Sequence, residues 1–228
     1  SALAEAEVEY MDKVSTSVDV LFKIVEPSEF IERTNASKIN NDNELFIPIW
    51  TTTPWTLPSN EAVAMGEDIP YGICSLTLHE RNILVVVANE LRESIEKRWG
   101  VSNLEMLEEV SAKNLSGLQL QHPFDERTVP VLLGDHVTTE NGTGSVHTAP
   151  AHGQEDFQIG KENDLDLKCY VNSYGVFTDA KESFAKQHIF KSESEIIERL
   201  DESNLLISSE KFEHSYPHCW RHKTPVIF

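Results

Sequence analysis

The sequence TTTPWT, which begins at Thr51, places short hydroxyl side chains beside a proline and a tryptophan. Pro54 cannot donate a backbone hydrogen bond and restricts the residue before it, so a strand must end or leave its sheet here. If the chain stays extended, Thr51 and Thr53 point to one face and Thr52 to the other. Such an edge could hold a polar ligand and a water molecule beside Trp55, although threonine is also common in ordinary strands.

A second segment, NGTGSVHTAPAHGQEDF (residues 141–157), combines glycines, histidines and a carboxylate. Its Asn-Gly pair and Gly144 predict a tight hairpin turn, which makes Ser145–Thr148 the returning strand. An Ala-Pro pair ends that strand, and Asp156 follows in the first turn of a helix, where the positive helix end favours a carboxylate. Asp156 could therefore hold a cationic group of a ligand, or it could be an ordinary first-turn acid.

Two groups of histidines invite a zinc interpretation. His147 and His152 are five residues apart, and HSYPHCWRH (residues 214–222) contains three histidines and Cys219. Neither group has the paired cysteines or the HExxH spacing that is typical of zinc sites. Packing of a returning strand is the favoured interpretation of residues 214–222, and a metal-dependent hydrolase stays an alternative.

The composition is that of a folded globular chain. Its 228 residues can bury a sizeable core, and 39% of them are hydrophobic. No apolar run approaches the ~20 residues that cross a membrane, and no signal peptide is visible. Three widely spaced cysteines argue against a disulfide framework. These features predict a cytoplasmic protein.

The net charge is strongly acidic, at −19 from 19 basic and 38 acidic residues. Binding to nucleic acid depends on Lys and Arg side chains that neutralise phosphates. The balance argues against nucleic acid as a partner that this chain binds by itself. Any RNA substrate must be held mainly by other parts of a larger protein.

Strand patterns dominate the chain, and helical patterns are fewer. The apolar run Asn82–Ala88 predicts a central buried strand, and Pro48 marks its own strand as an edge or a bulge. We therefore expect a mixed α/β, strand-rich fold with a barrel-like sheet and peripheral helices. The other predicted strands are Ser17–Glu26, Glu44–Thr52, Tyr71–Leu78, Leu104–Val110, Val129–Leu133, Ser145–Thr148 and Leu205–Glu213.

Three helices are predicted. Asn89–Trp99 has apolar residues at a spacing of four and a glycine, Gly100, that can end it. Ser192 and the glutamate three residues later form a capping box, which predicts that a helix opens at Ser192. The third helix begins near Gly153 and carries QEDFQIGKEN.

Three ordered motifs make the chain resemble the editing domain of isoleucyl-tRNA synthetases, the CP1 insertion of these class I enzymes. The motifs are WTTTPWTLPSN, GTGSVHTAPAHGQEDF and HSYPHCWRHKTPVIF, and the resemblance covers essentially the whole chain. The related valyl and leucyl editing domains typically have an arginine after two threonines and an acidic residue after the proline. Thr53 and Trp55 stand at those places here, which favours the isoleucyl type.

The resemblance implies a single editing domain over residues 1–228, with residues 1–16 and 214–228 connecting it to a catalytic domain. It implies hydrolysis of valine that is wrongly esterified to isoleucine tRNA, with the 3′ end of that tRNA as the partner. No cofactor is expected in this domain; ATP, magnesium and any zinc belong to the catalytic and anticodon-binding parts of the full synthetase. A non-catalytic interaction module is the further alternative.

Roles for individual residues follow only from the resemblance. Asp156 is expected to bind the α-ammonium group of the misattached amino acid, and Thr53 to lie near the attacking water. The other residues expected to line the site for the aminoacyl ester, the terminal adenosine or the amino-acid side chain are Thr51, Thr52, Trp55, Thr56 and His147.

Overall fold

The computed structural model describes residues 7–102, 104–178 and 182–227. Residues 1–6 and 228 of the two expected connecting segments lie outside the described residues. The strands are β1 (Val8–Ile24), β2 (Leu45–Thr51), β3 (Ala62–Met65), β4 (Pro70–Leu78), β5 (Arg81–Ala88), β6 (Glu105–Ser111), β7 (Gln119–Gln121), β8 (Thr128–Leu133), β9 (Ser145–Thr148) and β10 (Leu206–Cys219). The helices are α1 (Pro27–Thr34), η2 (Pro54–Ser59), η3 (Asn89–Leu91), α2 (Arg92–Trp99), α3 (Ala112–Leu115), α4 (Gln154–Glu162), η4 (Glu182–Phe184) and α5 (Ile189–Glu202).

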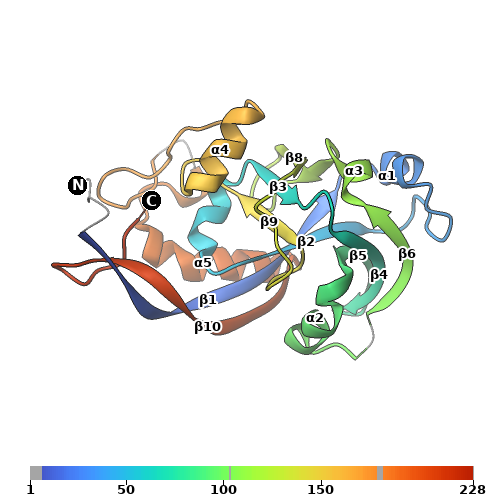
Figure 1. Cartoon of the computed structure of the whole chain (residues 1–228), viewed down its shortest axis with the longest axis horizontal. Helices are drawn as coiled ribbons and strands as arrows, with labels where there is room; N and C mark the ends of the chain where they lie inside the picture. Colours follow the sequence, from blue (N-terminus) through green and yellow to red (C-terminus); the bar gives the residue numbers. More distant parts are fainter. Residues whose placement is uncertain (1–6, 103, 179–181, 228) are drawn as a thin grey trace.

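The strands form one mixed sheet in the order β6-β4-β5-β2-β1-β7-β8-β3-β9, and β10 pairs with β1 (Figure 1). This confirms the strand-rich mixed α/β fold. Every strand pattern identified in the sequence corresponds to a strand in the structure. Most ends differ by a few residues, but β1 begins nine residues before the predicted Ser17 and β10 continues six residues beyond the predicted Glu213. The two short strands β3 and β7 carried no recognisable pattern, because four residues or fewer are too short to show a period.

The far end of the sheet returns to its middle, which makes it barrel-like. β9, the last strand in the order, lies in contact with β2. Just before β9, the Thr143 hydroxyl donates to the Pro48 carbonyl at 2.6 Å, and the Ala88 amide donates to the Thr143 carbonyl at 2.9 Å. β5 pairs with β2 only at Leu45 and Phe46, so Pro48 lies beyond that pairing and opens its backbone to this returning loop. The prediction that the strand of Pro48 is an edge strand or bulged is therefore wrong for β2 as a whole, which lies between β5 and β1; only its part beyond Phe46 lacks a partner on the β5 side.

The predicted hairpin around Gly142 and Gly144 is wrong. β9 forms at Ser145–Thr148 as expected, but it pairs antiparallel with β3, not with a strand that precedes the turn. Both glycines have positive φ, as the sequence indicated. They lie in the loop that leads into β9, and this loop is hydrogen-bonded to β2 through Thr143. A turn signal fixes the local backbone only, whereas the partner of the next strand is chosen by burial.

The predicted capping box at Ser192 is also wrong. α5 begins three residues earlier, at Ile189, and His188 caps it by accepting the Phe190 amide on its Nδ1 atom. Ser192 is fully buried inside the helix, where its hydroxyl donates to the Ile189 carbonyl. The other two helices agree with the sequence: α2 ends at Gly100 with φ of 66°, and α4 begins after Gly153.

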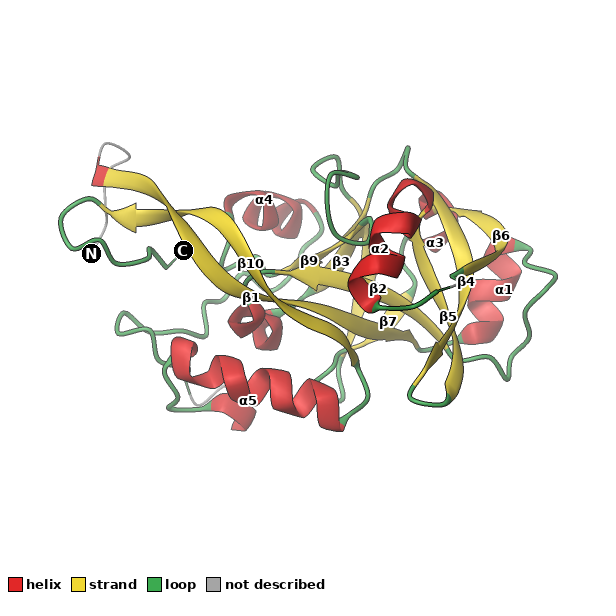
Figure 2. Cartoon of the chain, turned by 90° about the horizontal axis from the view of Figure 1, so that it is seen from below, coloured by secondary structure: helices red, strands yellow, loops and turns green. Residues whose placement is uncertain are grey.

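β1 and β10 extend beyond the sheet as a long two-stranded ribbon. Their register runs from the pair Val8–Cys219 to the pair Val20–Leu206, and the described ends of the chain lie together at the tip of the ribbon (Figure 1). In Figure 2 the ribbon passes between α4 and α5. Pairing with β10 makes residues 8–16 a strand, ahead of the predicted start at Ser17.

The core is a continuous apolar cluster that fills the curled sheet and reaches α2 and α5. Among the described residues, no helix is both long and apolar enough to cross a membrane.

Candidate functional site

The threonine motif lies at the end of β2, where the chain leaves the sheet. β2 ends at Thr51 and the short helix η2 begins at Pro54, as the proline predicts. The Thr51 and Thr53 hydroxyls lie 3.3 Å apart, and the Thr53 amide donates to the Thr51 hydroxyl at 3.1 Å. The two side chains therefore share a face, and the Thr52 side chain is half-buried beside them.

η2 folds the motif back so that Thr56 meets His147. The Thr56 amide and hydroxyl both donate to the Thr53 carbonyl, at 3.1 and 2.8 Å. The Thr56 hydroxyl also lies 2.9 Å from His147 Nε2 on β9. Trp55 is 4% exposed, and its ring meets the His152 ring edge to face at 5.0 Å. The structure thus brings two motifs together that are about ninety residues apart.

Hydrogen bonds fix the protonation of the His147 ring. Asn60 Nδ2 lies 2.7 Å from His147 Nδ1 and also donates to the Ala62 carbonyl at 2.8 Å, which identifies Nδ2 as the donor. His147 Nδ1 must then accept, so Nε2 carries the proton and donates to the Thr56 hydroxyl. Burial, together with the neighbouring His122 and His152, lowers the pKa of His147 to about 3. The ring is neutral and held at both nitrogens.

Asn60 belongs to this network, but the sequence reasoning did not identify it. It is fully buried and is the last residue of TTTPWTLPSN, where it reads as a polar residue of a turn. The one available signal was its place directly before the apolar strand β3, since a buried amide there must find hydrogen-bond partners.

Asp156 lies in the first turn of α4, as predicted. Its Oδ2 atom accepts the Ala149 amide at 2.9 Å, which ties the carboxylate to the chain just beyond β9. Gly153 makes room for it, because a Cβ atom there would lie 3.3 Å from the carboxyl carbon. Burial raises the pKa of Asp156 above its usual value, although the Ala149 amide and the nearby His136 act in the opposite direction.

A cavity of about 300 Å³ opens beside the threonine motif. Thr51 and Thr52 line it, together with Trp50 and His136. The loop from Glu140 to Gly144 and the start of β9 complete the wall. Of the predicted residues, these two threonines contact the cavity directly.

The remaining predicted residues do not line this cavity. Thr53, Thr56 and His147 form a hydrogen-bonded layer that continues from Thr51, which does line it. Asp156 is connected to the cavity through His136, a lining residue with which its carboxylate interacts electrostatically. The cavity itself thus presents the hydroxyls of Thr51 and Thr52 and the ring of His136.

The second histidine group lies on the ribbon. His214 is on β10, with Nε2 2.9 Å from the Ser15 hydroxyl on β1, and Cys219 Sγ lies 3.5 Å from His222 Nδ1 at the end of the ribbon. A larger cavity of about 750 Å³ lies there, and its lining includes Cys219 and His222 as well as His152 of the first group. Within residues 7–102, 104–178 and 182–227, no group of three or more His, Cys, Asp or Glu side chains is placed to hold a metal ion.

The comparisons with known proteins assign this fold and its threonine motif to a class. A family model described as "Leucyl-tRNA synthetase, editing domain" matches residues 38–213. The chain belongs to this family, and it is therefore an editing domain of the class I synthetase type, a class that proofreads by deacylation.

Within the family, the chain is similar to isoleucine–tRNA ligases. It is 44% identical over 228 residues to the isoleucine–tRNA ligase of Francisella tularensis subsp. tularensis, and 44% identical over 229 residues to that of Pseudoalteromonas atlantica. Both alignments cover 100% of this chain and 24% of the relative. The chain thus spans about a quarter of the length of these relatives.

Solved structures show the same fold. The editing domain of cytosolic leucyl-tRNA synthetase from P. knowlesi has a TM-score of 0.65 at 12% identity, covering 90% of this chain and 97% of that one. The corresponding P. falciparum domain has a TM-score of 0.65 at 6% identity, covering 88% of this chain and 100% of that one.

Proposed function

We propose that this domain hydrolyses valine esterified to isoleucine tRNA, within a full-length isoleucine–tRNA ligase. The similarity to isoleucine–tRNA ligases over the whole chain supports the choice of tRNA. A pocket for isoleucine rejects valine poorly, because one methylene contributes only ~1–3 kcal/mol to binding. Discrimination between isoleucine and valine is the known example of this general limit, and the figure is not a property measured on this chain. A second, smaller site must therefore remove the wrong product.

The observation that carries the proposal is the partly buried Asp156 carboxylate, which interacts electrostatically with His136 in the lining of the small cavity. Its raised pKa means that burial makes the negative charge costly in the free protein. Ionisable side chains whose pKa is shifted by burial are often found at functional sites. The ammonium group of an aminoacyl ester would supply the opposite charge, in an environment where an ion pair is stronger than in water.

The reaction needs no covalent intermediate. A water molecule near the Thr53 hydroxyl attacks the ester carbonyl carbon, the bond from that carbon to the ribose oxygen breaks, and the ribose oxygen takes up a proton. The products are free valine and tRNA with an intact terminal hydroxyl. Thr51 and Thr52 position the ester and the terminal adenosine, and orientation of the water accounts for much of the rate.

Selection against isoleucine is assigned to Trp55, Thr56 and His147. All three are buried outside the lining, so they would act by holding the lining threonine Thr51 in place; hydrogen bonds link His147 to Thr56, Thr56 to Thr53 and Thr53 to Thr51. An additional methyl group pressed into a rigid wall is strongly disfavoured, whereas a missing one only loses contact. A small site can therefore exclude isoleucine where a larger site fails to exclude valine.

The acidic charge suits a domain that engages only the 3′ end of the tRNA, while the rest of the synthetase holds its body. We propose no cofactor for this domain and a cytoplasmic location.

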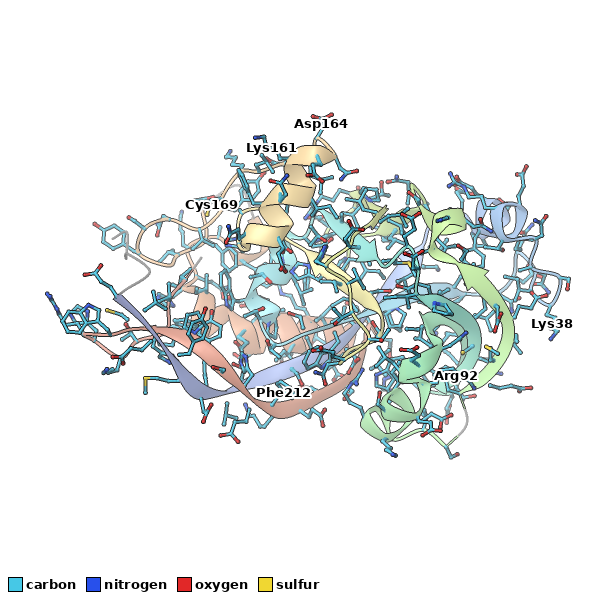
Figure 3. All side chains as sticks on the ribbon, in the orientation of Figure 1. Lys38, Arg92, Lys161, Asp164, Cys169 and Phe212 are labelled. Atoms are coloured by element: carbon cyan, nitrogen blue, oxygen red, sulfur yellow. The ribbon has the colours of Figure 1, made fainter. Side chains whose placement is uncertain are left out.

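The test is deacylation of valyl- and isoleucyl-tRNA by the full-length protein and by the domain alone. Asp156→Asn keeps an oxygen that can accept the Ala149 amide but removes the charge, and should slow valyl-tRNA hydrolysis about 10–100-fold. Asp164→Asn is the matched control, because Asp164 is exposed just beyond the other end of α4 and points away from the sheet (Figure 3).

Unchanged hydrolysis of valyl-tRNA by Asp156→Asn would show that Asp156 does not bind the ammonium group of the substrate. A wild-type protein that hydrolyses neither ester, with or without the remaining synthetase, would instead support the non-catalytic interaction module.

A further inference from the structure

A buried ion pair stands directly behind the candidate site. Arg98, in the last turn of α2, donates from Nε to Asp19 Oδ2 at 2.8 Å and from Nη2 to Asp19 Oδ1 at 2.9 Å. The Asp19 side chain on β1 is 2% exposed and the Arg98 side chain 13% exposed. The pair thus joins an outer helix to the longest strand of the sheet.

The same guanidinium reaches the loop that lines the cavity. Arg98 Nη2 also donates to the Gly142 carbonyl at 2.9 Å, and the guanidinium lies 6.0 Å from the centre of the Trp50 ring. Gly142 has φ of +87°, and a Cβ atom there would lie 3.5 Å from Trp50 Cβ. Gly142 and Trp50 both line the cavity, whereas Arg98 and Asp19 do not.

Neutralising Asp19 does not require this third hydrogen bond. A buried ion pair by itself is weak evidence for stability, because hydrophobic residues of similar size often replace it without loss. What the guanidinium adds is a rigid planar set of donors that binds the carboxylate through two bonds and the carbonyl through a third, whereas the three donors of a lysine ammonium rotate and do not form this fork. The arrangement therefore fixes geometry in the loop.

Neutral bonds hold the rest of the same loop. The buried Tyr71 hydroxyl donates to the Gly144 carbonyl at 2.5 Å, and Thr143 bonds to β2 and β5 as described above. Gly142 lies at the outer side of this loop, against Trp50, so its position sets the distance between two walls of the cavity.

We propose that Arg98, oriented by Asp19, is a positioning residue that sets the width of the substrate cavity through Gly142. The proposal rests on the editing function proposed above. Release of the Gly142 carbonyl lets the loop move away from Trp50, which widens the cavity, weakens binding of the valyl ester and admits the isoleucyl ester.

The test compares Arg98→Lys with Arg92→Lys in the full-length protein. Arg92 is the matched control, since it lies on the same helix and its Nη2 donates to a backbone carbonyl, that of Leu104, at 2.8 Å, away from the cavity. Arg98→Lys should raise KM for valyl-tRNA about tenfold and change kcat less. It should also lower the ratio of the valyl-tRNA hydrolysis rate to the isoleucyl-tRNA hydrolysis rate. Hydrogen exchange of the amides in residues 140–145 should become faster in Arg98→Lys alone.

Asp19→Asn serves as the second variant if Arg98→Lys is unstable. It keeps an oxygen that can accept from Arg98 but removes the negative charge of Asp19, and it should show the same changes in weaker form. Unchanged exchange in residues 140–145, or faster exchange with unaltered KM and selectivity, would overturn the proposal. If the wild-type protein lacks deacylase activity, the proposed function fails, and the exchange measurement still decides whether Arg98 holds the loop.

Discussion

The barrel and the ribbon of this molecule place a histidine in opposite surroundings. In the barrel, His147 is buried, neutral and bonded at both nitrogens to Thr56 and Asn60. On the ribbon, His214 is half-buried on a two-stranded surface, where its ring lies between those of Phe212 and Tyr216. Both regions matched a metal-site pattern equally poorly in the sequence.

The difference lies in what surrounds each ring. A buried imidazole must satisfy both nitrogens within the protein, so its orientation and tautomer are fixed. A histidine on a two-stranded ribbon packs against aromatic neighbours and keeps access to water. Only the first arrangement provides the fixed geometry that a selective pocket needs.

The largest expected effect is the difference in the free energy of unfolding when a histidine is truncated in each region. His147→Ala should lower the free energy of unfolding by about 2–4 kcal/mol, because two buried polar groups lose their partner and a cavity forms. His214→Ala, the same truncation on the ribbon, should cost less than about 1 kcal/mol. Urea unfolding of both variants measures this, and equal costs would contradict the comparison.

His147→Ala should also change selectivity under conditions where it is folded. Opening the wall should allow hydrolysis of isoleucyl-tRNA while valyl-tRNA remains a substrate. Equal slowing of both reactions, with the ratio preserved, would show that His147 supports the fold and takes no part in excluding isoleucine.

The second prediction concerns pH. The pKa of His147 is about 3 in the folded protein and 6.5 in the reference state, so the unfolded chain takes up a proton over this window that the folded chain does not. The free energy of unfolding should therefore fall as pH drops from 6.5 towards 3, by at most about 1.4 kcal/mol per pH unit from this site. His147→Gln should flatten this part of the curve, and His214→Gln should flatten it less. A wild-type curve that matches His147→Gln would contradict the buried neutral ring.

The third prediction is a gain in stability at the site itself. The pKa of Asp156 is higher in the folded protein than in the unfolded chain. At a pH above the folded pKa, the charged carboxylate therefore lowers the free energy of unfolding, and this loss disappears as pH falls through the folded pKa. Asp156→Asn should therefore keep or raise the melting temperature at neutral pH, by the equivalent of up to about 1 kcal/mol, while deacylation becomes slower. Calorimetry beside the rate assay tests this, and a marked drop in melting temperature would make Asp156 a structural acid.

The smallest expected effect is that of metal removal. Deacylation should survive exhaustive chelation, because we assign no metal to either histidine group. A reversible loss of activity that zinc restores would revive the metal-dependent hydrolase and would point first to the ribbon group around Cys219 and His222.

The sequence alone determined the features that depend on neighbours in the chain. Pro54 ends β2 and Gly100 ends α2, because backbone sterics act over a few residues. Thr51 and Thr53 share a face although the chain leaves the strand at Thr51, because the Thr53 amide donates to the Thr51 hydroxyl. The position of Asp156 in a first helical turn follows from the same local signals. Motif resemblance added the family, without explaining what holds the motif residues in place.

The tertiary structure decided everything that joins distant segments. β9 pairs with β3 and not with a hairpin partner, Ser192 is buried inside α5, and Asn60 orients the ring of His147 eighty-seven residues away. Arg98 likewise meets Asp19 and Gly142 only because the sheet curls back on itself. Local patterns cannot predict these contacts, because the partner of a buried polar group or a strand edge is selected by the burial and hydrogen bonding of the whole fold.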